Sequence, residues 1–162
     1  MPLFQWCKWL QHTQLATTIN ESAWLFPVVE GSHILALPIS VGLIFIFDLR
    51  LIGVVFGGEP VAKIMNQVLR WSRAGFAAMF VTGGLLFMTQ AEKAYGNVLF
   101  RTKLTLLVLL AINAAVYQLT FYPKMARWEL DGTPVGAKLC GWLSLVAWIG
   151  VIVCGRTMAY EF

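Results

Sequence analysis

The stretch WLFPVVEGSHILALPISVGLIFIFDLRLIGVVFG, residues 24–57, decides the fold predicted for this chain. It is apolar over more than the roughly 20 residues that an α-helix needs to cross the hydrocarbon core of a bilayer. Pro38 lies inside it and lacks the N–H that would bond to the carbonyl of Ile34, so we expect a kink there. The stretch therefore predicts a kinked transmembrane helix over residues 24–47.

The composition agrees with a membrane protein. Of 162 residues, 59% are hydrophobic and 12% are charged, whereas about a quarter of the residues in soluble proteins are charged. The net charge of +4 is spread among apolar segments, which argues against a nucleic-acid partner. Three cysteines without a CxxC pair predict neither a disulfide framework nor a zinc site, and the N-terminus does not resemble a cleavable signal peptide. We expect one domain, residues 1–162, in the lipid bilayer.

Three more apolar stretches predict further crossings, over residues 74–88, 104–122 and 139–154. The second is rich in Gly and Ala, which allow helices to approach closely in lipid, and Pro123 is expected to end the third. The predicted fold class is all-α, an integral membrane four-helix bundle with both termini on one side.

Two amphipathic segments flank the predicted crossings. Residues 3–16 place Leu3, Trp6 and Trp9 on one face, which predicts an interfacial helix, with a frayed terminus as the alternative. Residues 60–73 predict a short surface helix between the first and second crossings. Seven Lys and Arg residues fall on the loop side and five on the terminal side, so the positive-inside rule predicts both termini outside. In the inner membrane of a Gram-negative bacterium, that side is the periplasm.

Antiparallel connectivity would gather polar residues of all four crossings in one layer. A pocket there could hold haem propionates, a quinone headgroup or a carboxylate substrate through charge-assisted hydrogen bonds. Alternatively, the cations reach the membrane surface and Glu30 pairs with one of them. The candidate residues are Glu30, His33, Arg101, Lys103, Arg156 and Tyr160.

His33 is the one histidine within a predicted crossing. It is a candidate metal ligand, for haem iron or copper, because imidazole is a common ligand of both. A six-coordinate haem would also need a ligand such as Met79 or Met88, or a residue from another chain. The structural alternative is a neutral imidazole bonded to Glu30 or to a neighbouring helix.

Two further polar groups are expected to have structural roles. Asp48, Arg50, Arg70 and Arg73 are predicted to form a salt-bridged cluster at the other membrane face. Asn113, in the middle of the third crossing, is predicted to bond across helices.

Several motifs carry a resemblance to a known family. In order they are EGSH (residues 30–33), DLRLIG (48–53), FRTKL (100–104) and GRTMAY (155–160). The pattern resembles a bacterial four-span inner-membrane family of unknown function, which implies the fold but no activity. A more distant resemblance is to the haem-b membrane protoporphyrinogen oxidase type, where His33 and Lys103 match family positions and Gln118 stands where a second His would be.

The first functional hypothesis is a membrane subunit that supports electron transfer, with a polar outer-leaflet pocket for haem b or a quinone. The second is a non-catalytic anchor or assembly subunit without a cofactor. A small transporter or copper-handling protein is the third. The expected partners are other membrane or periplasmic subunits, or further copies of the chain.

Overall fold

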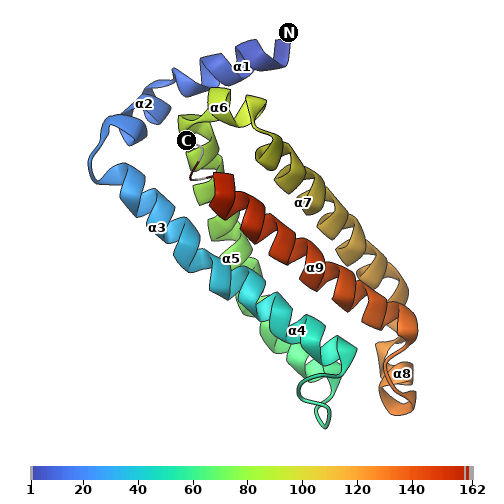
Figure 1. The fold of residues 1–162 in the computed structure, drawn as a ribbon. Coiled ribbons are helices and arrows are strands. Elements are labelled where there is room, and N and C mark those ends of the chain that lie inside the picture. The colour runs from blue at the N-terminus through green and yellow to red at the C-terminus, as the bar shows by residue number, and fades with distance from the viewer. Residues whose placement is uncertain (1, 159, 161–162) are drawn as a thin grey trace.

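The computed structural model describes residues 2–158 and 160, which form helices and no β-strand. Four long helical segments of this described part run back and forth (Figure 1). The start of the first helix and the end of the last lie at the same end of the molecule. The segments are α3 (Leu25–Leu37), η1 (Pro38–Gly42) and α4 (Leu43–Ile52), then α5 (Val61–Thr89), then α7 (Val98–Val116) and η2 (Tyr117–Phe121), and finally α9 (Val135–Met158).

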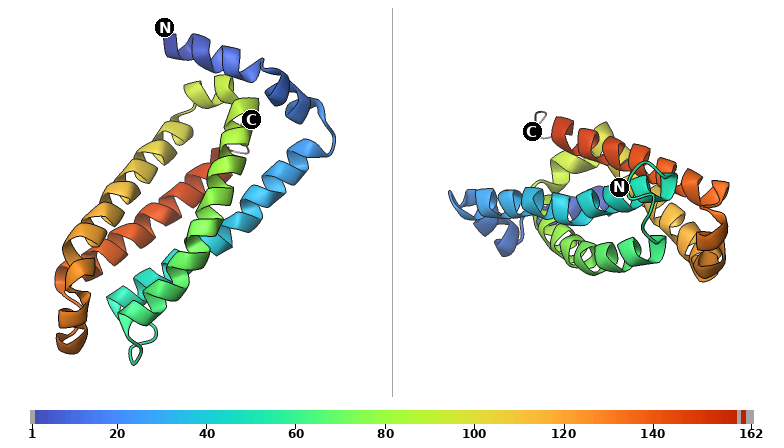
Figure 2. Two further views of the ribbon diagram at one scale, coloured as in Figure 1. Left: turned by 180° about the vertical axis from the view of Figure 1, so that it is seen from behind. Right: turned by 90° about the horizontal axis from the view of Figure 1, so that it is seen from below.

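Three of these segments are long and apolar enough to cross a membrane. They cover Leu25–Ile52, Val98–Trp128 and Val135–Met158. The remaining one, α5, is free of charged residues only over residues 74–89. It runs beside α3 and α4 (Figure 2). That α5 makes a fourth crossing stays a prediction.

The predicted break between a surface helix and the second crossing is wrong. Residues 61–89 form one continuous helix of 29 residues, α5. No proline interrupts it, and two of its glycines, Gly75 and Gly83, pack against the first segment. The polar first half therefore continues into the apolar second half as one helix.

Pro38 distorts the first segment, as predicted, and the distortion is a π-helical turn, η1. A π turn redirects backbone carbonyls away from the regular ladder. The Ser72 hydroxyl of α5 donates to the carbonyl of Ser40 at 3.0 Å. A Cβ on Gly75 would lie 2.7 Å from the Ser40 nitrogen, so only glycine allows α5 to approach this closely.

The expectation that Pro123 ends the third segment is also wrong. The helical path continues through η3 (Tyr122–Lys124) into α8 (Met125–Asp131). A π turn before the proline and a 3₁₀ turn around it absorb the missing N–H. The Trp128 indole donates to the carbonyl of Phe121 at 3.0 Å, which satisfies a backbone group near the irregular turn.

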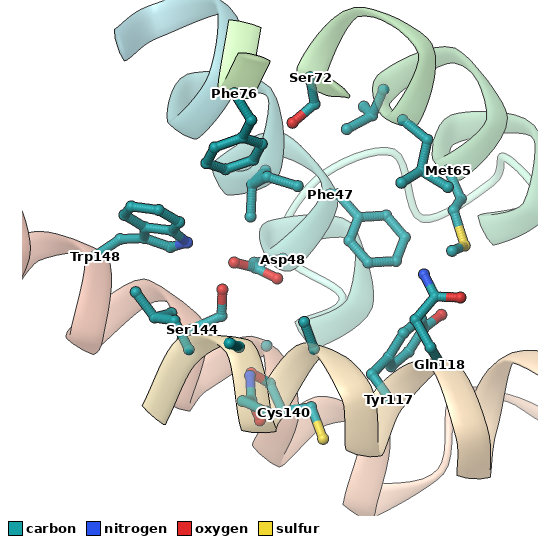
Figure 3. A pocket seen from close by; sticks show the side chains of 18 of the residues that line it. Phe47, Asp48, Met65, Ser72, Phe76, Tyr117, Gln118, Cys140, Ser144 and Trp148 are labelled. Carbon is teal, nitrogen blue, oxygen red and sulfur yellow. The ribbon is translucent and has the colours of Figure 1, made fainter. Parts of the chain in front are cut away.

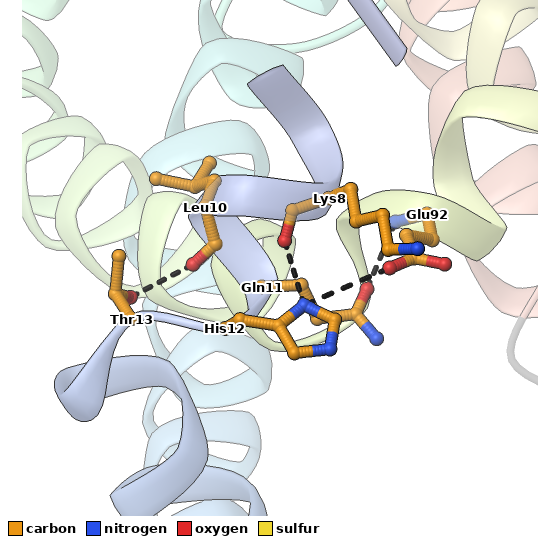
Figure 4. A network of polar contacts seen from close by, with 6 residues as sticks. All are labelled: Lys8, Leu10, Gln11, His12, Thr13 and Glu92. Atoms are coloured by element: carbon orange, nitrogen blue, oxygen red, sulfur yellow. Dashed lines mark hydrogen bonds and ion pairs between the residues drawn. The ribbon is translucent and has the colours of Figure 1, made fainter. Parts of the chain in front are cut away.

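The N-terminal region is helical and packed rather than frayed. Helices α1 (Pro2–Gln11) and α2 (Gln14–Glu21) cross the terminal end of the long segments (Figures 1 and 2). The Gln11 side chain accepts a 2.9 Å hydrogen bond from the backbone N–H of Glu92, in α6 (Ala91–Gly96), and the His12 ring lies 3.8 Å from the Glu92 carboxylate (Figure 4). Trp6 and Trp9 are exposed on the opposite face, as an interfacial helix requires.

The apolar core lies mainly in the half of the molecule away from the termini. One cluster joins the end of α4, the start of α5 and the region around α8, and includes Phe47, Met65 and Trp128. A second cluster surrounds Trp148 of α9 and includes Leu110 of α7. The half nearer the termini holds the predicted polar layer.

Candidate functional site

The polar layer begins with His33 on α3, which faces α5. Its Nδ1 lies 2.8 Å from the Thr82 hydroxyl, and a Cβ on Gly83 would lie 3.0 Å from its Cε1. The imidazole is half-buried and packs on the α5 backbone instead of pointing into lipid. His33 is therefore hydrogen-bonded to the neighbouring helix, and no bond to Glu30 is seen among the described residues.

The hydrogen bonds around Thr82 assign the tautomer of a neutral His33. The Thr82 hydroxyl has one hydrogen, and it donates to the carbonyl of Ala78 at 2.7 Å. It therefore accepts from His33, whose proton then lies on Nδ1. The lone pair of Nε2 is left as a hydrogen-bond acceptor or metal ligand.

Lys103 brings a positive charge to this layer from α7. It interacts electrostatically with His33, and its Nζ would lie 3.6 Å from a Cβ on Gly155 of α9. The side chain is only partly exposed, and it forms no ion pair with any residue that the structure describes. His33 thus contacts α5, and Lys103 lies beside α9. That all four long segments converge at one polar layer stays a prediction.

The other candidate residues lie at the edge of this layer. The Arg101 guanidinium donates to the carbonyl of Tyr95 at 3.2 and 3.3 Å, and is exposed. The Arg156 guanidinium lies 5.2 Å from the ring centre of Tyr160, and both side chains are exposed. Glu30 is half-buried and pairs with none of these cations. The expected ion pair of Glu30 is therefore not formed.

The surroundings of His33 do not fit a haem. A porphyrin needs several hundred Å³ beside the axial ligand, and His33 lines neither of two cavities in the described part of the chain, one at Asp48 and one at Trp128. One edge of the imidazole is already closed by Gly83. Within the described residues, no three His, Cys, Asp or Glu side chains group as metal ligands. We therefore derive no chemistry through haem or copper.

The predicted salt-bridged cluster around Asp48 is wrong. Asp48 is 4% exposed, and its Oδ2 has no hydrogen-bonding partner among the described residues. Arg50 instead donates to the carbonyl of Glu59 at 2.9 Å, which ties the loop after α4 to the helix end. Asp48 lies on the face of α4 that points into the molecule, whereas long arginine side chains can reach the surface.

Asp48 lies at a cavity of about 370 Å³. Its walls come from α4, α5, α7, η2 and α9, and most of them are apolar. The Ser144 hydroxyl points towards the Asp48 carboxylate, and Phe76, Phe47 and Trp148 surround it (Figure 3). The polar side chains of the lining include Asp48, Ser72, Arg73, Asn113, Gln118 and Ser144.

Sequence reasoning missed this cavity because its walls come from four distant segments. The signal available was a carboxylate on the same helix face as Ile44 and Leu51, both of which line the cavity. The prediction for Asn113 is confirmed, since its side-chain amide donates to the carbonyl of Cys140 at 2.9 Å. That bond joins α7 to α9 beside the cavity.

The long apolar helices and the polar groups enclosed between them define a multi-pass membrane protein. Residues 13–161 match the model of a family of unknown function, DUF6644, and the chain belongs to that family. Comparisons with curated proteins and with solved structures gave no match.

Proposed function

We propose that the chain is an integral membrane subunit that supports electron transfer by holding a quinone headgroup at the polar layer of His33 and Lys103. The supporting observation is the ammonium group of Lys103, which sits near the start of a candidate crossing without an anionic partner among the described residues. A charge at such a position is costly unless it reaches water or a polar ligand. A quinone carbonyl would accept a hydrogen bond from it.

His33 complements Lys103 in this proposal. With its proton held by Thr82, a neutral His33 offers the Nε2 lone pair as an acceptor for the O–H of a quinol. One residue would then donate to the oxidised form, and the other would accept from the reduced form. Glu30, Arg101, Arg156 and Tyr160 would lie at the rim of the site.

The proposal extends to location and partners. The chain would lie in a bacterial inner membrane with both termini in the periplasm, as the distribution of Lys and Arg suggests. A quinone-binding subunit also needs an electron donor or acceptor, which would be another membrane or periplasmic protein, or a second copy of the chain. The exposed N-terminal helices at the same end offer a surface for it.

The test is the quinone content of the purified protein. Extraction and chromatography should find quinone with the natural protein and with Lys103→Arg, and at least tenfold less with Lys103→Met. The matched control is Lys63→Met, which removes an exposed lysine paired with Glu59. Equal quinone in Lys103→Met and Lys63→Met would refute the proposal.

A second candidate is a non-catalytic anchor or assembly subunit. It is favoured by the packing of His33, which is bonded to Thr82 and closed on one edge by Gly83 as a purely structural residue would be. In that case His33→Ala would lower thermal stability and the yield of a complex with a co-purifying partner. Quinone content would be negligible in all variants.

A further inference from the structure

The Asp48 cavity lies in the opposite half of the molecule from the polar layer and is independent of the proposed quinone site. Asp48 is buried within a candidate crossing, and one carboxylate oxygen has no partner among the described residues. An unpaired carboxylate is expensive in a medium of low dielectric constant. A ligand that supplies a compensating group would therefore gain binding energy there.

The cavity walls indicate the chemistry of that ligand. Phe47, Phe76 and Trp148 stand around the carboxylate (Figure 3), and aromatic faces attract cations. No three acidic, His or Cys side chains group as metal ligands in the described part of the chain. Aromatic walls around a single carboxylate suit an organic cation with apolar substituents.

The one basic residue of the lining does not neutralise Asp48. Arg73 lines the cavity from α5, but it is exposed and forms no ion pair with Asp48. Asp48 is therefore the acidic group of the cavity, and the positive residue of the lining lies at its exposed edge.

The mouth of the cavity lies between α5 and α7. The exposed apolar residues of the lining are on these two helices, Phe80 on α5 and Ala111 and Ala114 on α7. The closely packed pairs are α5 with α3 and α4, α4 with α9, and α7 with α9. Because α7 belongs to a candidate crossing, an opening beside it would face the acyl chains, and a ligand would enter from the lipid.

We propose that this cavity binds a lipophilic organic cation whose charge pairs with Asp48. Its volume of about 370 Å³ lies within the 300–1,000 Å³ of typical small-molecule sites. An opening towards the lipid would select for apolar substituents.

The test uses tetraphenylphosphonium and tetraphenylborate, which have nearly the same size and shape and opposite charge. Purified protein in nanodiscs should bind the radiolabelled cation saturably, above the uptake of empty nanodiscs, and should not bind the anion saturably. Asp48→Asn should weaken cation binding by at least tenfold. Glu59→Gln, which removes a carboxylate outside this cavity at the same end of the molecule, should leave it unchanged.

A second pair of variants tests the mouth without touching Asp48. Ala111→Trp, at an exposed position of the lining, should slow or weaken cation binding, and Leu109→Trp, exposed on the same helix outside the lining, should not. Cation uptake equal to that of empty nanodiscs, equal affinity in Asp48→Asn, or saturable binding of only the anion or a neutral quinone would overturn the proposal. Failure here leaves the quinone content at Lys103 unaffected, so the two proposals are separable.

Discussion

The contact between Gly75 and the π turn gives the sharpest stability prediction. A Cβ at position 75 would lie 2.7 Å from the Ser40 nitrogen and 3.0 Å from both the Ile39 carbonyl carbon and the Ser40 Cα. These are backbone atoms and cannot rotate away. Ordinary contact begins at 3.4 Å, so Gly75→Ala requires α5 and η1 to separate by about 0.7 Å.

That separation would also weaken the hydrogen bond next to it. The Ser72 hydroxyl donates to the Ser40 carbonyl at 3.0 Å, and a shift of this size takes the pair beyond hydrogen-bonding distance. Overpacking costs about 1–3 kcal/mol, and a hydrogen bond between membrane helices contributes about 0.6 kcal/mol. We expect Gly75→Ala to destabilise the protein by about 2–3 kcal/mol.

The assay is unfolding in detergent, followed by tryptophan fluorescence, with Gly84→Ala as the matched control. Gly84 lies on the same helix, and no atom lies within 4 Å of a Cβ built there. Alanine should be neutral or stabilising at that position by up to about 1 kcal/mol, because it has the higher helix propensity. Equal stability of the two variants would refute the close contact between α5 and η1.

Three further variants test the polar interior. Asn113→Leu should destabilise by about 0.6–2 kcal/mol in the same unfolding assay, because the bond to the Cys140 carbonyl is lost; an unchanged midpoint would contradict it. Asp48→Asn should stabilise the ligand-free protein by about 1–3 kcal/mol, because it removes an unpaired buried carboxylate; destabilisation would mean that the carboxylate has a structural partner. Arg50→Met should change the free energy of unfolding by less than about 1 kcal/mol. It should speed proteolysis of the 53–60 loop, because the bonds to the Glu59 carbonyl hold that loop; an unchanged cleavage rate would show that the loop is held by other contacts.

The local features that the sequence predicts well are those set by one residue's covalent chemistry. Proline lacks an N–H, so the distortion at Pro38 follows from its position alone. Asn113 in an apolar crossing must find a partner, and it does. The apolar lengths likewise predict the helices that can cross a membrane.

The features that the sequence does not predict depend on contacts between distant segments. Pro123 was expected to end a helix, but the Trp128 indole and two irregular turns carry the chain past it. The sequence places Asp48 and three arginines at the same membrane face, but the orientation of α4 turns Asp48 inward. The site around Asp48 becomes evident only after folding brings Ser144, Phe76 and Trp148 around its carboxylate.

The proposed polar layer requires His33 and Lys103 to lie close together, and chemical cross-linking tests this directly. In a chain whose three native cysteines are replaced by serine, His33→Cys with Lys103→Cys should cross-link efficiently with a short bismaleimide in membranes, because the proposed polar layer brings these positions on α3 and α7 together. His33→Cys with Lys138→Cys should not, because Lys138 lies at the far end of α9. Cross-linking of the second pair and not the first would contradict the arrangement of the helices.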